Sequence, residues 1–170
     1  NDFPTGIAEC GTDALRFGLL AYTIQGRDIN LDIQRVVGYK QFCNKVWNAT
    51  RFALTYVSDF TPQSYSEVRN LYNHPHISTR DRFILSRLNN TIKECNKNLQ
   101  DYLFGAVTSA LHSFFLYDLC DHYLEFAKPI FYDNSPENAG RKHAAQSTLY
   151  TVLETFLRLC HPIMPFLTEE

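Results

Sequence analysis

The chain contains 170 residues, of which 45% are hydrophobic and 20% are charged, and its formal net charge is −2. This length and composition suit one globular domain, or one domain with a short appendage, and argue against a disordered or collagen-like chain. No apolar run approaches the ~20 residues that a membrane-spanning helix needs, so we expect no membrane partner.

The spacing of the apolar residues predicts five long helices and little strand, which is an all-α fold. The first helix spans 11–23, because Thr12 and Asp13 suit a first helical turn and Gly26 interrupts the pattern.

The second predicted helix spans about 33–57 and begins after Asp32, a good N-cap residue. Its apolar positions recur at intervals of four and three, which predicts a packing seam along one side. The seam residues are Tyr39, Cys43, Val46, Thr50, Ala53 and Val57. Trp47 lies beside this seam, and we expect its ring to be a buried core anchor.

A long polar connection, 58–78, leads to a third helix at about 80–99, which Ser78 or Thr79 can cap. Its seam is predicted from Leu85, Leu88, Ile92, Cys95 and Leu99.

The fourth helix, about 101–127, is apolar almost all round, and Pro129 is expected to end it. The fifth spans about 141–160 and stops before Pro162. Long helices joined by short or modest links predict an antiparallel helix bundle of four to five long helices.

A polar stripe follows the second helix on the side turned away from its seam. Asn44, Asn48 and Arg51 lie at helical spacing, and Lys45 borders them one turn from Asn48. Amides can hydrogen-bond base edges, cations hold phosphates, and unpaired RNA loops are commonly bound in this way. The alternative is a polar face that contacts only solvent.

The third helix carries a similar stripe of exposed type: Arg82, Ser86, Asn90, Lys93 and Lys97, with Arg87 at its border. Residues 35–97 contain ten Lys or Arg against four Asp or Glu, whereas 101–170 contain four against nine. If the second and third helices are neighbours, their two cationic faces would form one groove that suits a polyanion.

A metal site is the competing hypothesis for the fourth helix, where Asp118, Asp121, His122 and Glu125 share one face. Di-metal bundles need matching ligands from a second helix, and none is present, so we expect a polar face without metal. The five cysteines are widely spaced, which indicates reduced, buried thiols of a cytoplasmic protein. The sequence contains no Gly-rich phosphate loop, H-E-x-x-H or G-x-S-x-G motif.

Several segments together resemble the valyl-tRNA synthetases, which are class I aminoacyl-tRNA synthetases. The segments are GTDALRF (11–17), GRDIN (26–30), GYKQFCNKVWNATRF (38–52), DRFILSRLN (81–89), FFLYDLCDHYLE (114–125) and LRLCHPIMPFLTEE (157–170). The last three are similar to blocks of the isoleucyl and leucyl enzymes, so the same domain of such an enzyme is an alternative. A helical protein-interaction module without RNA is a second alternative.

The resemblance implies a connecting segment and helix at 1–31, following an absent catalytic domain, and an anticodon-binding helical bundle at 32–170. It implies a parent enzyme that attaches valine to tRNA(Val) with ATP and magnesium, and a fragment that binds tRNA only, without a catalytic residue or cofactor of its own. The expected partners are tRNA(Val), not DNA, and the catalytic domain of the same chain.

The resemblance also assigns candidate contact residues. Those expected to meet the anticodon stem-loop are Asn44, Lys45, Asn48, Arg51, Arg82, Arg87 and Asn90. Arg27 and Asp28 are expected at the domain junction or at the inner corner of the tRNA.

Overall fold

The computed structural model describes residues 6, 8–24, 31–58, 60–61 and 70–170. Within these ranges the chain is all-α, as predicted, and no strand is present. In chain order the elements are α1 (Thr12–Tyr22), α2 (Ile33–Tyr56), η1 (Leu71–Asn73), α4 (Thr79–Gln100), α5 (Phe104–Ser113), η2 (Phe114–Leu124), α6 (Glu125–Tyr132), η3 (Pro136–Asn138), α7 (Ala139–Cys160) and α8 (Pro165–Glu169). None of the described helices is long and apolar enough to cross a membrane.

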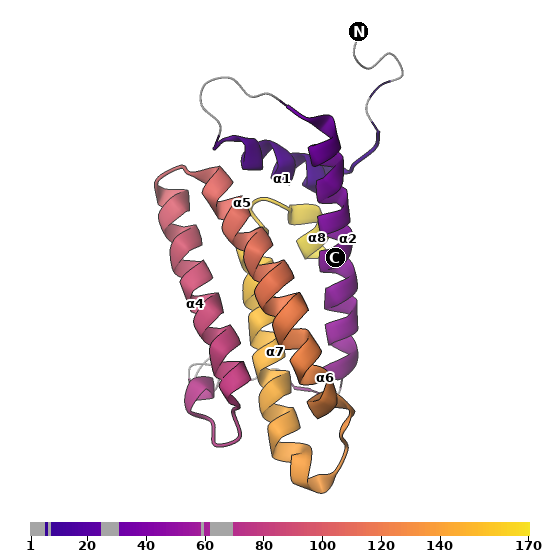
Figure 1. The fold of residues 1–170 in the computed structure, drawn as a ribbon, viewed down its shortest axis with the longest axis vertical. Coiled ribbons are helices and arrows are strands. Elements are labelled where there is room, and N and C mark those ends of the chain that lie inside the picture. Colours follow the sequence, from indigo (N-terminus) through magenta and orange to yellow (C-terminus); the bar gives the residue numbers. More distant parts are fainter. Residues whose placement is uncertain (1–5, 7, 25–30, 59, 62–69) are drawn as a thin grey trace.

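The long helices run along one axis in alternating directions, so the predicted antiparallel bundle is confirmed (Figure 1). Elements α5, η2 and α6 follow one another without a break and form a single rod, 104–132. This rod and α7 occupy the centre, α4 and α2 lie at opposite edges, and α1 lies across one end (Figure 1). Helix α4 packs on the rod and α7, whereas α2 packs most extensively on α1.

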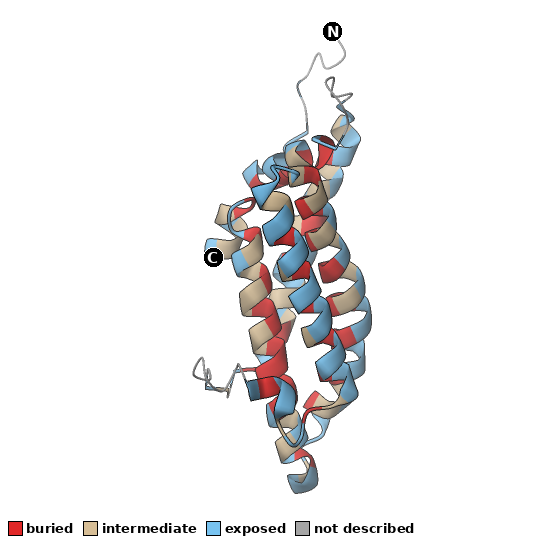
Figure 2. Ribbon diagram, turned by 90° about the vertical axis from the view of Figure 1, so that its left-hand side faces the viewer, coloured by how far each residue is buried: buried red, intermediate tan, exposed pale blue. Residues whose placement is uncertain are grey.

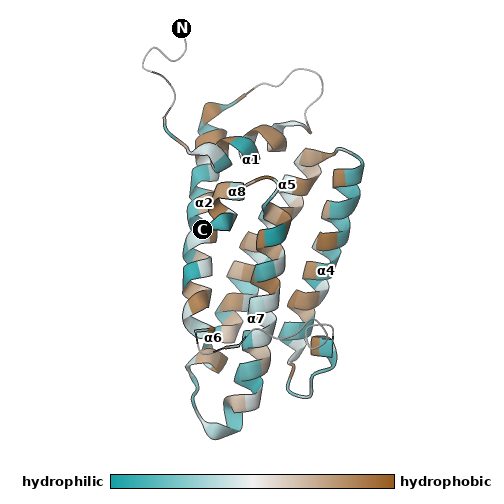
Figure 3. Ribbon diagram, turned by 180° about the vertical axis from the view of Figure 1, so that it is seen from behind, coloured by the Kyte–Doolittle hydropathy of each residue, from teal (hydrophilic) through white to brown (hydrophobic). Residues whose placement is uncertain are grey.

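The predicted adjacency of α2 and α4 is therefore wrong. The rod is apolar on most of its circumference, and burying it requires neighbours on several sides. It takes the centre together with α7, and the amphipathic α2 and α4 cover its flanks. Hydrophilic and hydrophobic residues alternate along α4, as expected for a helix at the edge of a bundle (Figure 3).

Both long edge helices begin at the side chains that the sequence indicates. The carboxylate of Asp32 accepts from the backbone N–H of Gln34 at 2.9 Å, and α2 begins directly after it. At the start of α4 the Oγ of Ser78 accepts from Asp81 N at 3.2 Å, and Ser78 N donates to Asp81 Oδ2 at 2.9 Å. This reciprocal capping box satisfies two backbone N–H groups that the helix leaves unpaired.

The prediction for the fourth helix is wrong at both ends. Helix α4 extends to Gln100, and the rod begins at Phe104 after a turn in which Tyr102 has φ of 56°. The rod continues past Pro129 to Tyr132. Its last turn persists because Phe131 is buried and stacks on Tyr56, with ring centroids 4.7 Å apart.

The core lies between the rod, α7 and the inner sides of α2 and α4, where buried residues face one another (Figure 2). Its largest fully buried side chains include Phe17, Phe114, Phe115 and Phe156.

Two side chains of α1, Asp13 and Arg16, hold α8 and the segment before it against α1. Leu167 N donates to the buried Asp13 carboxylate at 2.6 Å, and Arg16 Nε donates to the carbonyl of Ile163 at 2.8 Å. These bonds tie the end of the chain to its beginning and place α8 beside the middle of α2 (Figure 1).

The predicted burial of Trp47 is wrong, because the residue is 41% exposed. The inward positions of α2 are taken by Val36, Phe42, Val46 and Ala53. Trp47 follows Val46 by one residue, which turns it by ~100° around the helix axis to the edge of the buried side.

Candidate nucleic-acid interface

The polar stripe of α2 lies on the surface. Asn44, Lys45, Asn48 and Arg51 are all exposed, while Val46 and Ala53 on the opposite side are buried. Neither Lys45 nor Arg51 forms an ion pair with any other described residue. The stripe therefore presents two free cations and two amides on one accessible helix face, as its helical phase predicts.

A groove of about 240 Å³ separates this stripe from the C-terminal part of the rod. Lys45, Asn48 and Phe52 line it on the α2 side, and Cys120 and Lys128 line it on the other side. The Nζ of Lys128 lies 5.6 Å from the centroid of the Phe52 ring, which is within cation–π distance. Lys128 thus adds a third cation to the surface.

Lys128 was missed by the sequence analysis, because the fourth helix was expected to end before it. Its Nζ is 2.7 Å from both carboxylate oxygens of Glu125, one helical turn earlier. This exposed pair contributes little to stability, and the cation remains accessible to an anionic ligand. The Glu-x-x-Lys spacing was the available signal that the helix continues to this residue.

Trp47 and the stripe residue Arg51 lie on the side of α2 that faces away from the groove. Both residues line a second hollow of about 290 Å³ between α2, α7 and α8, together with Leu54, Leu157 and Leu167. An indole that is partly exposed beside a guanidinium offers a surface on which an unpaired base can stack. The exposed ring is better placed for such a contact than the buried anchor expected from sequence.

The candidates on α4 lie at the opposite edge of the bundle and do not join the α2 stripe (Figure 1). Arg82 Nε donates to the carbonyl of Tyr72 at 3.3 Å, and Arg87 Nε donates to Asp118 Oδ2 at 3.0 Å. Both guanidinium groups thus already have partners within the chain, whereas Asn90 is simply exposed. Arg27 and Asp28 lie outside the described residues.

Three of the four candidate metal ligands on the rod, Asp118, His122 and Glu125, have partners within the chain. Asp118 pairs with Arg87, Glu125 pairs with Lys128, and His122 Nδ1 contacts the carbonyl of Tyr117. In the described ranges no three His, Cys, Asp or Glu side chains are placed to hold a metal ion.

Burial determines the pKa values of the cysteine thiols in the bundle. It raises the pKa values of Cys43, Cys95 and Cys120 to about 11, so these groups stay protonated near neutral pH. Cys120, at the floor of the groove, is therefore a packing residue and a poor nucleophile.

An all-α bundle with an accessible amide-and-cation face on an edge helix has the architecture and chemistry of an RNA-binding helical domain. A family model described as the anticodon-binding domain of tRNA ligase matches residues 81–170. The chain belongs to this family of anticodon-binding domains of tRNA ligases.

Valine–tRNA ligases are among the proteins to which the chain is similar. The chain is 52% identical to that of Mus musculus over 170 residues, which are 99% of this chain and 13% of the relative. It is 49% identical to that of Takifugu rubripes, with 99% and 14% covered, and 44% identical to that of Syntrophotalea carbinolica, with 98% and 18% covered. The chain thus spans less than a fifth of the length of these relatives.

Proposed function

We propose that this chain is the anticodon-binding domain of a valine–tRNA ligase and that it binds the anticodon stem-loop of tRNA(Val) on the exposed face of α2. The observation that supports this most strongly is the unpaired stripe of Lys45, Asn48 and Arg51, flanked by Trp47 and Lys128, in a chain that matches valine–tRNA ligases over almost its whole length.

Each residue type has a distinct task on this surface. The amides of Asn44 and Asn48 can donate to and accept from base edges of an open loop. Lys45, Arg51 and Lys128 hold the phosphates on either side, and Trp47 provides a stacking surface for an unpaired base. On α4, Arg82, Arg87 and Asn90 form at most a separate contact, because α4 lies at the opposite edge of the bundle from α2 (Figure 1).

The division at residue 31 into a connecting segment and a bundle is part of the same proposal. Helix α1 packs against α2 and α5, so it forms the end of the bundle that adjoins the preceding part of a longer enzyme. In that enzyme the catalytic domain would use ATP and magnesium to attach valine to the tRNA, in the cytoplasm. This domain positions the tRNA, does not act on DNA and carries out no chemistry.

The test is a pair of matched double variants. Lys45→Ala with Arg51→Ala should weaken binding of a tRNA(Val) transcript by ~1–3 kcal/mol for each side chain that meets a base or a desolvated phosphate. The slope of log K against log salt should decrease by about two, because two phosphate contacts are lost. Lys93→Ala with Lys97→Ala removes the same charge from exposed positions of α4 and serves as the control.

Fluorescence titration at three salt concentrations measures both quantities. Equal losses in the two double variants would mean that only the overall charge matters, and the α2 assignment would fail. If the wild-type chain bound a scrambled stem-loop as tightly as the tRNA, a helical protein-interaction module would be the better assignment.

A further inference from the structure

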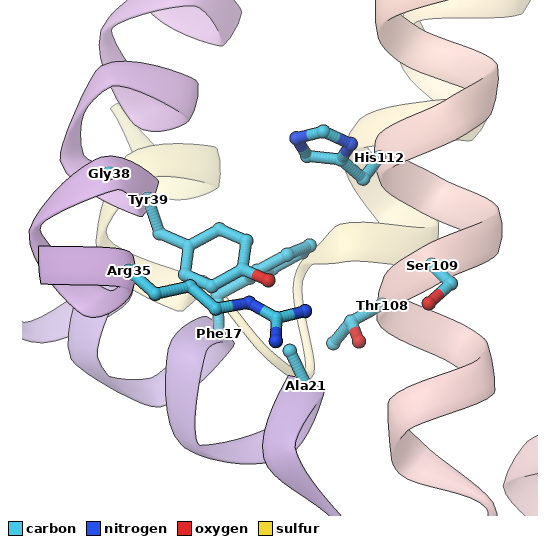
Figure 4. Close-up of a pocket in the computed structure, with 8 residues that line it drawn as sticks. All are labelled: Phe17, Ala21, Arg35, Gly38, Tyr39, Thr108, Ser109 and His112. Carbon is cyan, nitrogen blue, oxygen red and sulfur yellow. The ribbon is translucent and has the colours of Figure 1, made fainter. Parts of the chain in front are cut away.

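A cavity of about 450 Å³ lies between α1, α2 and α5 (Figure 4). It is at the end of the bundle where α1 lies, away from the groove that Lys45 and Lys128 line (Figure 1). Its volume falls within the range of ~300–1,000 Å³ typical of small-molecule sites. Arg35 and Tyr39 line it from α2, and Ser109 and His112 line it from α5. The assigned surface of α2 uses none of these residues.

Polar groups converge on this cavity from both walls. The guanidinium of Arg35 extends from α2 toward the Thr108 side of α5, and His112 extends from α5 toward α2 (Figure 4). The guanidinium lies 5.0 Å from the centroid of the Tyr22 ring and has no carboxylate partner in the described part of the chain. Ser109 Oγ donates to Gly105 O at 2.9 Å, which leaves its oxygen lone pairs available as acceptors.

The same cavity has aromatic walls. The rings of Tyr39 and His112 meet edge to face with centroids 6.3 Å apart, and the centroid of the Phe17 ring lies 5.0 Å from that of Tyr39. A ligand that fits must therefore combine an anionic group with a flat, partly polar body.

Gly38 lies on the open side of the cavity, where the structure leaves room for a larger side chain. A glycine in a helix interior costs ~0.5–1 kcal/mol relative to alanine, so close packing usually explains it. Gly18 has such an explanation, because an added Cβ would lie 3.2 Å from Tyr39. A Cβ at Gly38 would meet nothing within 4 Å. Packing does not require this glycine, and the space beside it at the wall of the cavity is open, so a larger side chain placed there can reach into the cavity.

The cavity and the groove follow one line along α2. Gly38, Lys45 and Phe52 are seven residues apart, which places them on the same side of the helix. Seven residues correspond to ~10 Å of rise. The cavity thus opens along the same junction between α2 and the rod, about two turns before the groove.

We propose that this cavity receives one nucleotide of the bound RNA, with its phosphate on Arg35 and its base against the wall that Tyr39 and His112 form together, within reach of Ser109. The proposal rests on the proposed function, since it extends the RNA path from the groove toward α1. A free nucleotide has the same chemistry, and the experiment separates the two sources.

The experiment fills the cavity without disturbing its walls. Gly38→Leu should weaken binding of the tRNA(Val) transcript about tenfold, as the loss of one good contact does. Arg35→Ala and Ser109→Ala test the contacts without adding volume, and the first should have the larger effect. Gly38→Ala is the matched control, with tRNA affinity within twofold of wild type. Circular dichroism verifies that each variant is folded.

The outcomes separate this inference from the proposed function. Unchanged tRNA binding by Gly38→Leu and Arg35→Ala, while Lys45→Ala with Arg51→Ala loses affinity, would overturn the inference alone. Titration with adenosine monophosphate and cytidine monophosphate tests the other source. Saturable nucleotide binding that Gly38→Leu abolishes, with tRNA affinity unchanged, would assign the cavity to a free nucleotide and overturn its role in RNA binding. If Lys45→Ala with Arg51→Ala also binds tRNA unchanged, the proposed function fails as well.

Discussion

The bond between Tyr123 and Asp81 joins the centre of the rod to the start of α4, and both residues are buried, at 3% and 2% exposure. The phenol donates to Asp81 Oδ1 at 2.7 Å, while Oδ2 accepts from the backbone N and the Oγ of Ser78. Burial, together with the Asp81 carboxylate, raises the pKa of Tyr123 well above its usual value, so the phenol remains a donor.

Tyr123→Phe removes this donor and keeps the ring. A hydrogen bond to a charged group contributes about 1.5–3 kcal/mol, and the buried Oδ1 would lose its closest partner. Phenylalanine is slightly more apolar, which offsets part of the loss. We expect the free energy of unfolding to decrease by about 2 kcal/mol.

Urea denaturation followed by circular dichroism measures the change, and an unaltered m-value verifies that the variant unfolds in the same way. Tyr132→Phe is the matched control: its hydroxyl accepts from Tyr56 at 2.7 Å, but the residue is 65% exposed. The control should change stability by less than ~0.5 kcal/mol. Equal losses for the two variants would refute the claim that burial makes the Asp81 bond strong.

Three further predictions follow from the structure. Trp47→Ala should lower the free energy of unfolding, measured by urea denaturation, by about 2 kcal/mol, which is less than the ~3–5 kcal/mol of a fully buried ring; a larger loss would contradict its exposed position. In the wild-type chain Trp47 is the single tryptophan, so its fluorescence should change when the tRNA stem-loop binds. Tyr102→Gly should raise the free energy of unfolding by about 0.5–1 kcal/mol, seen as a higher urea midpoint, because it relieves a left-handed conformation at the end of α4 in a residue that is 77% exposed. A lower midpoint would show that the side chain stabilises the turn. Burial lowers the pKa of His112 below its usual 6.5. As the pH falls below ~6.5, the unfolded chain therefore binds the proton before the folded chain does, and the free energy of unfolding decreases. His112→Gln should lose less stability than wild type between pH 7.5 and 5.5, and an equal loss in both would refute this assignment.

The helix boundaries that the sequence predicted well are those with local signals. Asp32 and Ser78 cap their helices by bonds to residues two and three positions away, so their effect can be inferred without the rest of the fold. The continuation of the rod past Pro129 to Tyr132 could not be predicted in this way. Whether the helix persists depends on Phe131 packing against Tyr56, a residue 75 positions earlier in the chain.

The candidate site shows the same limit. The exposure of Asn48 and Arg51 follows from helical phase relative to the seam, and it was predicted. Trp47 lies at the edge of that seam, where a rotation of ~100° per residue does not decide between core and surface. Its exposure depends on where α7 and α8 lie, which no local pattern specifies. Lys128 was not predicted, because the fourth helix was expected to end before it.

The unbroken rod connects these results to the proposed function. Because 104–132 is continuous, its first part forms one wall of the cavity at Gly38, and its last part forms one wall of the groove at Lys45. Both hollows therefore keep a fixed separation along α2. A site that binds a strand at two points benefits from such rigidity, because the strand then meets partners that are already in position.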